Sequence, residues 1–486
     1  MALRGTAGGP MDVAVYDSNC GVDKSFVSSM RRCEPELNHV VGFKICCREC
    51  WRGMRLQSSV IGIWISLLFG LCGHLVIWVA IYNRLHATAI RRSVKKTLEK
   101  WICGAVGFIG LFYVWLGIRP FLLNDPSSEI FISWDVLGDS IVSFYLIACW
   151  CAWGAVVIRW GVWRWTQRRP NSVRVTRLGL LCGAYGCTRE DEPTREDERL
   201  IMERGDELRT ARVQPDGNAF PQSWFGDRWT ERLAKIPGNQ ILRLEVNEKE
   251  FGIPDLAPNF RGLTIAHASD FHMTGQMTEA FYQHLVEQIN KLECDLIALT
   301  GDLIDRPKCL PWLEAVFGRL VAPLGKYYVL GNHDCRIADE AMLRGMLKKA
   351  GLISPHGQWI TVEHRNGQVL LAGNELPWYP GAHELSTPPR SVEGRDALKI
   401  LLSHSPDQIH WAVDRGFDLM LAGHTHGGQI RPPVVGPIVS PSRFGPKYAG
   451  GEFQVGCTHL HVSRGVSGTH PLRFNCLPEI TRIRLV

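Results

Sequence analysis

The sequence Gly423-His424-Thr425-His426-Gly427-Gly428-Gln429 directly follows an apolar run, Leu419-Met420-Leu421-Ala422. The apolar run predicts a short buried strand bounded by glycine. Residues i and i+2 of an extended segment point the same way, so His424 and His426 can face one pocket, as metal ligands must. The glycines allow the backbone to turn sharply beside a bound group. Taken alone, this pattern fits ordinary loop histidines as well as a metal site.

Four upstream apolar runs end in the same way. Segment 263–268 is followed by Asp270 and His272, 296–299 by Asp302, 327–330 by Asn332, His333 and Asp334, and 398–402 by His404. Helices are predicted at 278–292, at 312–321 and up to about 349, with a hairpin at 358–373 and late strands near 459–463 and 480–485. Strands alternating with helices predict an α/β fold. Because α/β sheets form their sites beyond the carboxyl ends of strands, the five ends predict one shared cleft.

The side chains at these ends are suited to metal binding. They are Asp270, His272, Asp302, Asn332, His404, His424 and His426. Oxygen and imidazole donors without a thiolate favour Mn, Fe or Zn in a hydrolytic site over a structural zinc site. Seven donors are enough for two ions that share one bridging carboxylate. A single residue of this kind at the end of a strand is more often a turn or capping residue. The metal site is indicated by the occurrence of all seven residues together.

The whole series resembles the calcineurin-like metallophosphoesterase superfamily over residues 239–486. It reads Asp270-x-His272, Gly301-Asp302-x-x-Asp305, Gly331-Asn332-His333-Asp334, His404 and Gly423-His424-x-His426. The resemblance implies a four-layer α-β-β-α sandwich with two mixed sheets. The tail 427–429 is similar to that of a membrane-associated bacterial branch, some members of which are UDP-2,3-diacylglucosamine pyrophosphatases of lipid A synthesis.

The resemblance also implies a role for each site residue. Asp270, His272, Asp302 and His426 match the ligands of a first metal, and Asp302, Asn332, His404 and His424 match those of a second. His333 matches the residue that stabilises or protonates the leaving oxygen, and Asp334 is expected to orient it. Asp305 is either a group that hydrogen-bonds a ligand or a plain helix cap. Arg443, Lys447 and Tyr448 belong either to a substrate lid or to a solvated loop.

These assignments predict a metal-dependent phosphoric ester or anhydride hydrolase. Two divalent ions roughly 3.5–4 Å apart acidify a shared water, and the bridging hydroxide attacks phosphorus in line. Manganese is the preferred ion, with iron or zinc as alternatives. The expected substrate is a lipid-linked phosphodiester or pyrophosphate such as a UDP-linked acyl sugar, and the segment Leu376-Pro377-Trp378-Tyr379 either contacts acyl chains or packs internally. The alternatives are a phosphodiesterase of soluble nucleotides or other esters, and a non-catalytic binding scaffold of the same fold.

The N-terminal part predicts membrane anchoring. Residues 1–57 contain scattered cysteines and stay unassigned. The three-span region predicted at 58–165 rests on three apolar runs, at 57–83, 101–118 and 141–158. Runs of this length without charge predict three transmembrane helices, against the alternative of a buried helical bundle. Residues 166–238 are predicted to be a charged linker that leads to the domain at 239–486, and this domain is expected to open with an edge strand at 241–246.

Charge predicts the orientation and the partners of the chain. The first loop carries six basic residues between Arg84 and Lys100, whereas the second carries only Arg119. This asymmetry predicts that the catalytic domain lies in the cytoplasm. Together with the resemblance to a bacterial branch, it implies an integral protein of the bacterial inner membrane. The net charge of +6 on 486 residues is too mild to indicate nucleic-acid binding. The sequence does not indicate an oligomeric state.

Overall fold

The computed structural model describes residues 65, 68–90, 92–122, 141–166, 173–182, 222–380, 385, 397–433 and 435–486. The N-terminal segment 1–57 and the acidic and basic stretch 189–212 of the predicted linker lie outside the described residues.

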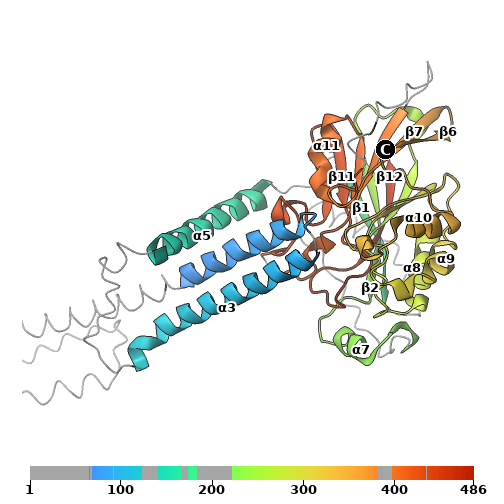
Figure 1. Ribbon diagram of the computed structural model, residues 1–486. Helices are drawn as coiled ribbons and strands as arrows, with labels where there is room; N and C mark the ends of the chain where they lie inside the picture. The colour runs from blue at the N-terminus through green and yellow to red at the C-terminus, as the bar shows by residue number, and fades with distance from the viewer. Residues whose placement is uncertain are drawn as a thin grey trace, which may run out of the picture. The chain divides into compact units, whose positions relative to one another are not determined.

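Two six-stranded sheets form the centre of the C-terminal part (Figure 1). The first sheet has the order β1 (Val173–Cys182), β2 (Arg243–Phe251), β12 (Glu479–Leu485), β3 (Thr264–Ala268), β4 (Leu296–Thr300) and β5 (Lys326–Val329). The second has the order β10 (Gly451–Val455), β11 (Thr458–Val462), β9 (Leu419–Ala422), β8 (Ala397–Ser403), β7 (Gly367–Asn374) and β6 (Trp359–His364). Both sheets are mixed: β3, β4 and β5 run parallel in one, and β7, β8, β9 and β11 run parallel in the other.

Helices cover the outer face of each sheet. They are α7 (Arg228–Ala234), α8 (Glu279–Asn290), α9 (Trp312–Phe317), α10 (Glu340–Lys349) and α11 (Ile409–Asp414). Short 3-10 turns lie at Gln222–Trp224, Pro258–Phe260, Pro307–Cys309, Asp334–Arg336, Pro406–Gln408, His426–Gly428 and Gly445–Tyr448. Helices α8, α9 and α10 lie together on one side of the strands, and α11 lies on the other (Figure 1).

Three clusters of buried hydrophobic side chains lie between these layers. Successive side chains of a single strand belong to different clusters. In β4, Ile297 and Leu299 pack with α8 and α9, whereas Leu296 and Ala298 face the second sheet. In β9, Leu419 and Leu421 belong to the cluster between the sheets, while Met420 packs toward α11. Side chains of a strand alternate between its two faces, so strands apolar on both faces must be covered on both. The layers are therefore helix, sheet, sheet and helix, as expected for the fold.

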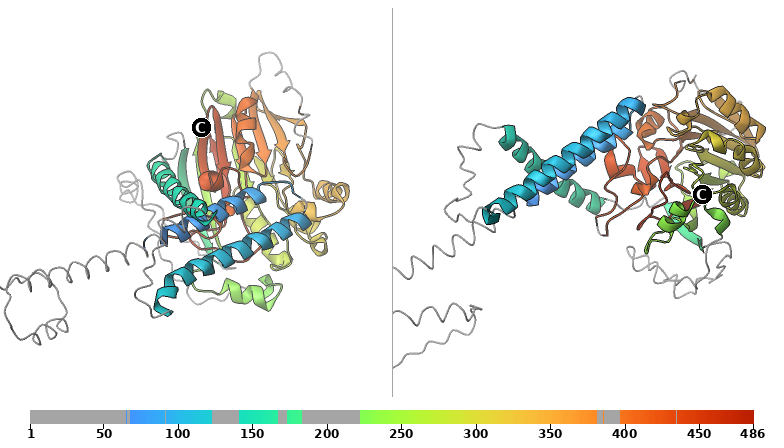
Figure 2. Two further views of the ribbon diagram at one scale, coloured as in Figure 1. Left: turned by 60° about the vertical axis from the view of Figure 1, so that its left-hand side comes forward. Right: turned by 60° about the horizontal axis from the view of Figure 1, so that its bottom comes forward.

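The last strand completes the first sheet from within. β12 pairs in parallel with β2 and antiparallel with β3, so it lies between two strands that come much earlier in the chain. The left view of Figure 2 shows this red C-terminal strand close to the green strands that come much earlier in the chain.

The strands and helices predicted from residue 263 onward are all present. The structure adds two elements in this range and corrects one prediction in the preceding linker. Strand β10 and helix α11 were not predicted. The linker prediction was wrong for Val173–Cys182, which forms β1 and pairs antiparallel with β2. As a result the strand predicted to open the domain near residue 241 is not an edge strand; it is β2, paired on both sides.

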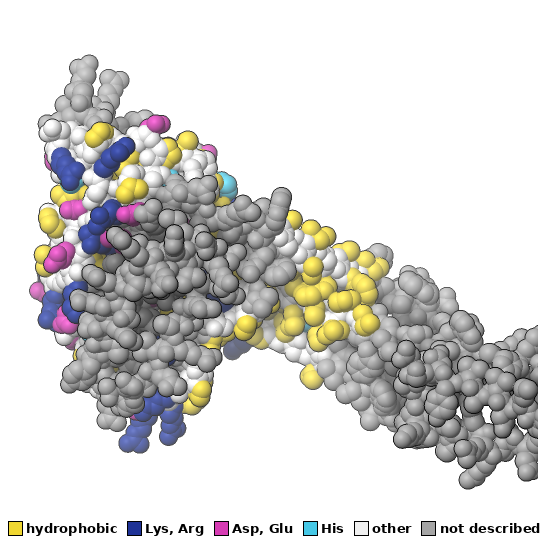
Figure 3. Space-filling view, turned by 180° about the vertical axis from the view of Figure 1, so that it is seen from behind, with side chains coloured by type: hydrophobic (Ala, Val, Ile, Leu, Met, Phe, Trp, Pro, Cys, Tyr) yellow, Lys and Arg dark blue, Asp and Glu magenta, His cyan; other side chains and the backbone are white. Residues whose placement is uncertain are grey.

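Three transmembrane helices are not confirmed. One described helix, Leu68–His86, is long and apolar enough to cross a membrane. The other two predicted spans fall within α3 (Arg92–Leu122) and α5 (Ile141–Thr166), which are helical without meeting that standard; α3 begins among basic residues. Hydrophobic side chains nevertheless gather over the helices in Figure 3, and Trp101 and Phe108 are about three-quarters exposed.

Candidate active site

The structure brings the first predicted group of ligands together. Asp270 and His272 follow β3, Asp302 follows β4 and His426 follows β9, and one donor atom from each lies within 4.8 Å of the others. The Nε2 atoms of His272 and His426 face each other at 2.9 Å. Two imidazole nitrogens this close, with two carboxylates around them, fit a metal ion between them.

The second predicted group lies beside the first and shares Asp302 with it. Asp302, His404 and His424 also have donor atoms within 4.8 Å of one another. His404 Nε2 lies 3.1 Å from His424 Nδ1 and 3.2 Å from Asn332 Oδ1. Asp302 therefore stands where a carboxylate bridging two ions is expected. Buried oxygen and nitrogen donors in this arrangement fit two divalent ions, and their identity stays open among Mn, Fe and Zn.

The charges of this cluster are strongly coupled. Burial disfavours a charged imidazole, but the carboxylates of Asp302 and Asp270 outweigh it and raise the pKa of His404 to about 9. Burial is the largest influence on His424 and His426, and it lowers the pKa of both well below the usual value. These two rings are therefore neutral, the state in which imidazole binds a metal.

The backbone is unusual at the same positions. Asp270, His272, Asp302, His424 and His426 all have φ between 49° and 72°. The left-handed region is uncommon for residues other than glycine and costs on the order of 1–3 kcal/mol at each position. Sequence patterns give no sign of this feature. It turns each side chain from the end of its strand toward the common cleft.

Two glycines are required because the loops approach so closely. A Cβ at Gly423 would lie 1.9 Å from Ser269 Oγ and 2.6 Å from Asp270 Oδ2. A Cβ at Gly331 would lie 2.3 Å from Asp302 Oδ1. No side chain fits at either position without moving a predicted ligand.

Groups behind the ligands fix the orientation of their rings. His404 Nδ1 donates to the carbonyl of Thr300 at 2.7 Å, which leaves Nε2 for the cleft. His272 Nδ1 lies 2.8 Å from Asp305 Oδ2, which likewise leaves its Nε2 for the cleft. Partners of this kind set the tautomer of a metal-binding histidine and increase its basicity.

His333 lies at the site, but its partner is not the expected one. Its Nδ1 is 2.5 Å from Asp305 Oδ1, from the loop that follows β4. Asp334 instead accepts hydrogen bonds from the backbone N–H groups of Leu303, Ile304 and Gly331. Burial, followed by the charge of Asp302, raises the pKa of Asp334 to about 7. The expectation that Asp334 orients His333 is therefore wrong, and any catalytic role of Asp334 stays a prediction.

Arg336 was missed from the sequence. Its guanidinium forms an ion pair with Asp305, and one nitrogen lies 3.3 Å from His333 Nε2. It comes seven residues after the end of β5 and lies outside the sequence motifs that predicted the site. Only its position just after Asp334 could have drawn attention to it.

Trp378 contacts the second group of ligands. The segment 376–379 was predicted either to contact acyl chains or to pack internally, and the structure divides it. The Trp378 ring centre lies 4.8 Å from that of His424 and 5.4 Å from that of His404. Tyr379 is buried in the core beneath α10.

The predicted lid residues also divide. Tyr448 is buried and packs against Phe444 and Phe453 in the cluster behind the second sheet, so it belongs to the core. Arg443 and Lys447 are exposed, and Arg443 is anchored by its backbone N–H to Asp407. A contact of either side chain with substrate stays a prediction.

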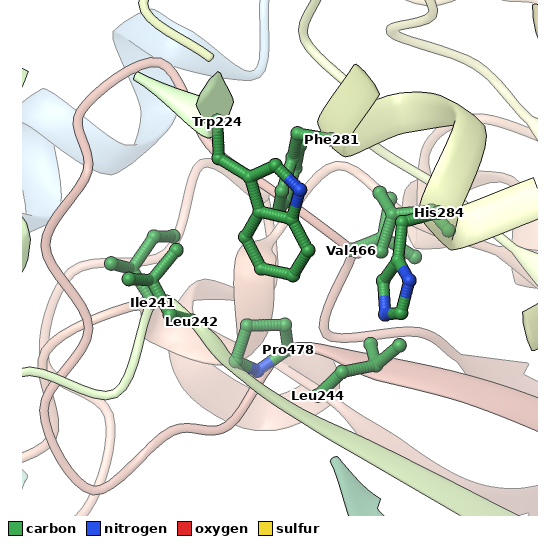
Figure 4. Close-up of a pocket in the computed structure, with 9 residues that line it drawn as sticks. Trp224, Ile241, Leu242, Leu244, Phe281, His284, Val466 and Pro478 are labelled. Atoms are coloured by element: carbon green, nitrogen blue, oxygen red, sulfur yellow. The ribbon is translucent and has the colours of Figure 1, made fainter. Parts of the chain in front are cut away.

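A separate apolar pocket offers no alternative site. It lies between Trp224, Phe281 and His284, and its lining also includes Leu244 of β2 and Leu242 just before that strand (Figure 4). It has room for about one water molecule, and its lining carries no cluster of acids or metal ligands. It is a small packing defect in the helix-covered core.

Comparison with known proteins agrees with this geometry. Residues 263–428, which hold all seven predicted ligands, match the family model of the calcineurin-like phosphoesterases. The chain is 35% identical to the uncharacterised metallophosphoesterase YkuE of Bacillus subtilis over 234 residues, 46% of this chain and 78% of that protein. It is 33% identical to the phosphodiesterase YaeI of Escherichia coli over 198 residues, 40% of this chain and 70% of that protein.

A third relative is named for a diacylated UDP-sugar. The UDP-2,3-diacylglucosamine pyrophosphatase LpxG of Chlamydia muridarum is 26% identical over 296 residues, 50% of this chain and 89% of that protein. Matches of this extent, over a segment with a dinuclear ligand arrangement, show the family and its chemistry. The chain belongs to the calcineurin-like phosphoesterase family and is a phosphoester hydrolase.

Proposed function

We propose that this protein is a membrane-anchored phosphohydrolase that cleaves a phosphodiester or pyrophosphate bond in a lipid-linked substrate. A UDP-linked acyl sugar is the first candidate. The observation that carries the proposal is the combination, in one chain, of the buried two-group ligand cluster with the apolar helix Leu68–His86. The similarity to the pyrophosphatase LpxG supports the same substrate class.

The ligand groups define what the protein contributes to the reaction. Two bound divalent ions supply Lewis-acid chemistry for hydrolysis at phosphorus. Asp302 holds the two halves of the site at a fixed separation because its carboxylate contributes to both groups. Asp305 and Thr300 keep the imidazoles of His272 and His404 turned into the cleft.

His333 is positioned for proton transfer to the leaving oxygen. Its Nδ1 is fixed by Asp305, so its Nε2, which also lies 3.3 Å from a guanidinium nitrogen of Arg336, is the atom that would exchange a proton with substrate. The ring stays partly accessible, with 17% of its side chain exposed, whereas the Asp305 side chain is fully buried. An imidazole held from behind by a buried carboxylate is a recurring acid–base arrangement. Arg336 adds a positive charge beside the same ring.

Trp378 gives the second half of the site an aromatic wall. Its ring packs beside His404 and His424 and is only partly buried. A ring at that place can stack on a planar or apolar group of the substrate. This supports a substrate with a base or acyl group near the phosphorus over a simple phosphate monoester.

The deciding experiment compares a UDP-linked acyl sugar with its deacylated analogue. Full-length protein in bilayers is supplied with Mn²⁺, and Asp302→Ala is the control for activity from contaminants. We expect a higher kcat/KM for the acylated compound, since enzyme and substrate then share one surface. Equal or faster cleavage of the deacylated compound would replace the lipid assignment with a soluble phosphodiester. If no phosphate ester is hydrolysed, the result would favour the alternative of a non-catalytic binding scaffold with the same fold.

A further inference from the structure

The loop at residues 430–439 exposes an unusual amount of apolar surface. Ile430, Val435, Ile438 and Val439 are each 40–50% exposed, and Pro433 is exposed between them. Among the described residues from 222 onward, nine large hydrophobic side chains are at least 40% exposed, and four of them lie in this loop. Single exposed apolar residues need no explanation, but a cluster marks an interaction surface.

The 430–439 loop is fixed to the active site. It begins four residues after His426, and Arg431 donates from its backbone to the carbonyl of Phe474 at 2.9 Å. The Asn475 side chain donates back to the Arg431 carbonyl, also at 2.9 Å. On the other side Pro437 packs on Gly428, where an added Cβ would come within 2.6 Å of it. The exposed side chains therefore have a defined position relative to the ligands.

The same loop meets the end of the apolar helix. Asn83, three residues before the end of helix Leu68–His86, donates through Nδ2 to the Ile438 carbonyl at 3.3 Å and accepts from the Ser440 N–H at 2.9 Å. Asn83 and Ser440 are both buried. A side-chain amide that matches a backbone N–H and C=O pair is a specific contact. It places the apolar loop at the level where the candidate membrane span ends.

We propose that the 430–439 loop lies on the bilayer, with Val435, Ile438 and Val439 entering the boundary between headgroups and acyl chains. This inference rests on the membrane anchoring in the proposed function. Exposed aliphatic side chains next to the end of a span meet lipid if that span crosses the bilayer. Arg84 and Lys96, exposed at the same end of the helices, suit anionic headgroups. The loop thereby holds the entrance beside His426 at the depth of a lipid-linked phosphate.

Photo-crosslinking tests the contact directly. Full-length protein is placed in phosphatidylcholine–phosphatidylglycerol nanodiscs as Val435→p-benzoylphenylalanine or Ile438→p-benzoylphenylalanine, and phospholipid adducts are measured by mass spectrometry. Leu75, exposed in the candidate span, is the positive control site, and Val321, 72% exposed after α9, is the negative one. We expect adducts at 435 and 438 comparable to those at 75, with only background at 321.

Each other result overturns the inference in a different way. Background yield at 435 and 438 with adducts at 75 means that the chain is anchored but the loop does not contact lipid. Background at all four sites means that the anchoring itself is wrong. Protein adducts at 435 in place of lipid adducts identify a protein interface. These readouts do not depend on the substrate, so they stand even if no lipid-linked phosphate is cleaved.

A kinetic comparison tests the consequence for activity. Ile438→Glu should raise the KM for an acylated substrate in bilayers about tenfold, because a charged side chain does not enter the acyl boundary. Its turnover of bis-p-nitrophenyl phosphate in solution should stay unchanged, which also shows that the variant is folded. Val321→Glu, the matched exposed control, should change neither. Equal KM values for Ile438→Glu and wild type in bilayers would contradict a lipid contact.

Discussion

At the scale of single residues, Asp305 and Asp334 have separate tasks. Asp305 contacts His272, His333 and Arg336, whereas Asp334 accepts from three backbone N–H groups. Asp305→Asn keeps the shape but removes the charge, so we expect kcat to fall about 10–100-fold with little loss of thermal stability. Asp334→Asn should instead lower Tm, because it places an amide N–H against backbone donors. Steady-state kinetics with thermal unfolding and metal content separates the two; equal kinetic losses at equal Tm would refute the division.

His404 makes metal binding depend on pH. With its pKa raised to about 9 by Asp302 and Asp270 against the effect of burial, the ring is protonated at neutral pH in the metal-free protein. It must lose that proton to bind an ion. The apparent affinity for the second ion should therefore rise about tenfold per unit between roughly pH 7 and 9 and then level off. Calorimetry in buffers of different ionisation enthalpy measures the released proton; a constant affinity over this range contradicts the assignment.

The sequence predicted which residues meet, but not how they are oriented. The seven ligand residues could be selected because each directly follows an apolar run. The partner of His333 was missed because sequence adjacency favoured Asp334, while the carboxylate that reaches the ring comes from the end of another strand. The left-handed backbone at Asp270 and His424 had no signal, since it is imposed by packing between loops distant in sequence.

At the scale of the elements, the tight packing of the β3 and β9 loops has a direct test. Gly423→Ala should reduce metal content and activity at least ~10²-fold, because its Cβ meets Ser269 and Asp270. The matched control is Gly345→Ala in α10, where nothing lies within 4 Å of the added Cβ. That change should leave activity intact and stabilise the helix by about 1 kcal/mol. Activity assays and thermal melts on both variants decide the point, and a fully active Gly423→Ala protein contradicts the geometry.

The elements that prediction missed have weak local patterns. β1 lies in a region that was interpreted as a charged linker, and its first half contains two arginines among valine and threonine. Its place in the sheet depends on pairing with β2, which is a long-range contact. Helix α11 is six residues long and too short for a clear periodic pattern. Runs apolar on both faces, such as β4 and β9, were predictable because burial on both sides leaves a continuous signal.

At the scale of the whole molecule, the distribution of basic residues predicts the side on which catalysis occurs. Six basic residues lie between Arg84 and Lys100, around the start of α3, against Arg119 alone near the end of that helix. Cells carrying a tag after Val486 should keep it intact when protease is added outside and lose it after permeabilisation. Digestion of the tag on intact cells would show that the catalytic domain lies on the outer side of the membrane.

The position of β12 fixes when the protein can become active. This strand lies between β2 and β3, and the backbone just ahead of it, at Val466 and Ser467, donates to the carbonyls of Ser269 and Asp270. During synthesis, β2 and β3 of the first sheet lack the strand that joins them until residues 479–485 leave the ribosome. Pairing over such long sequence separations is slow, so Asp270 gains its final support late in folding. Under the anchoring proposed above, a nascent chain would therefore reach the membrane before its metal centre is able to bind ions.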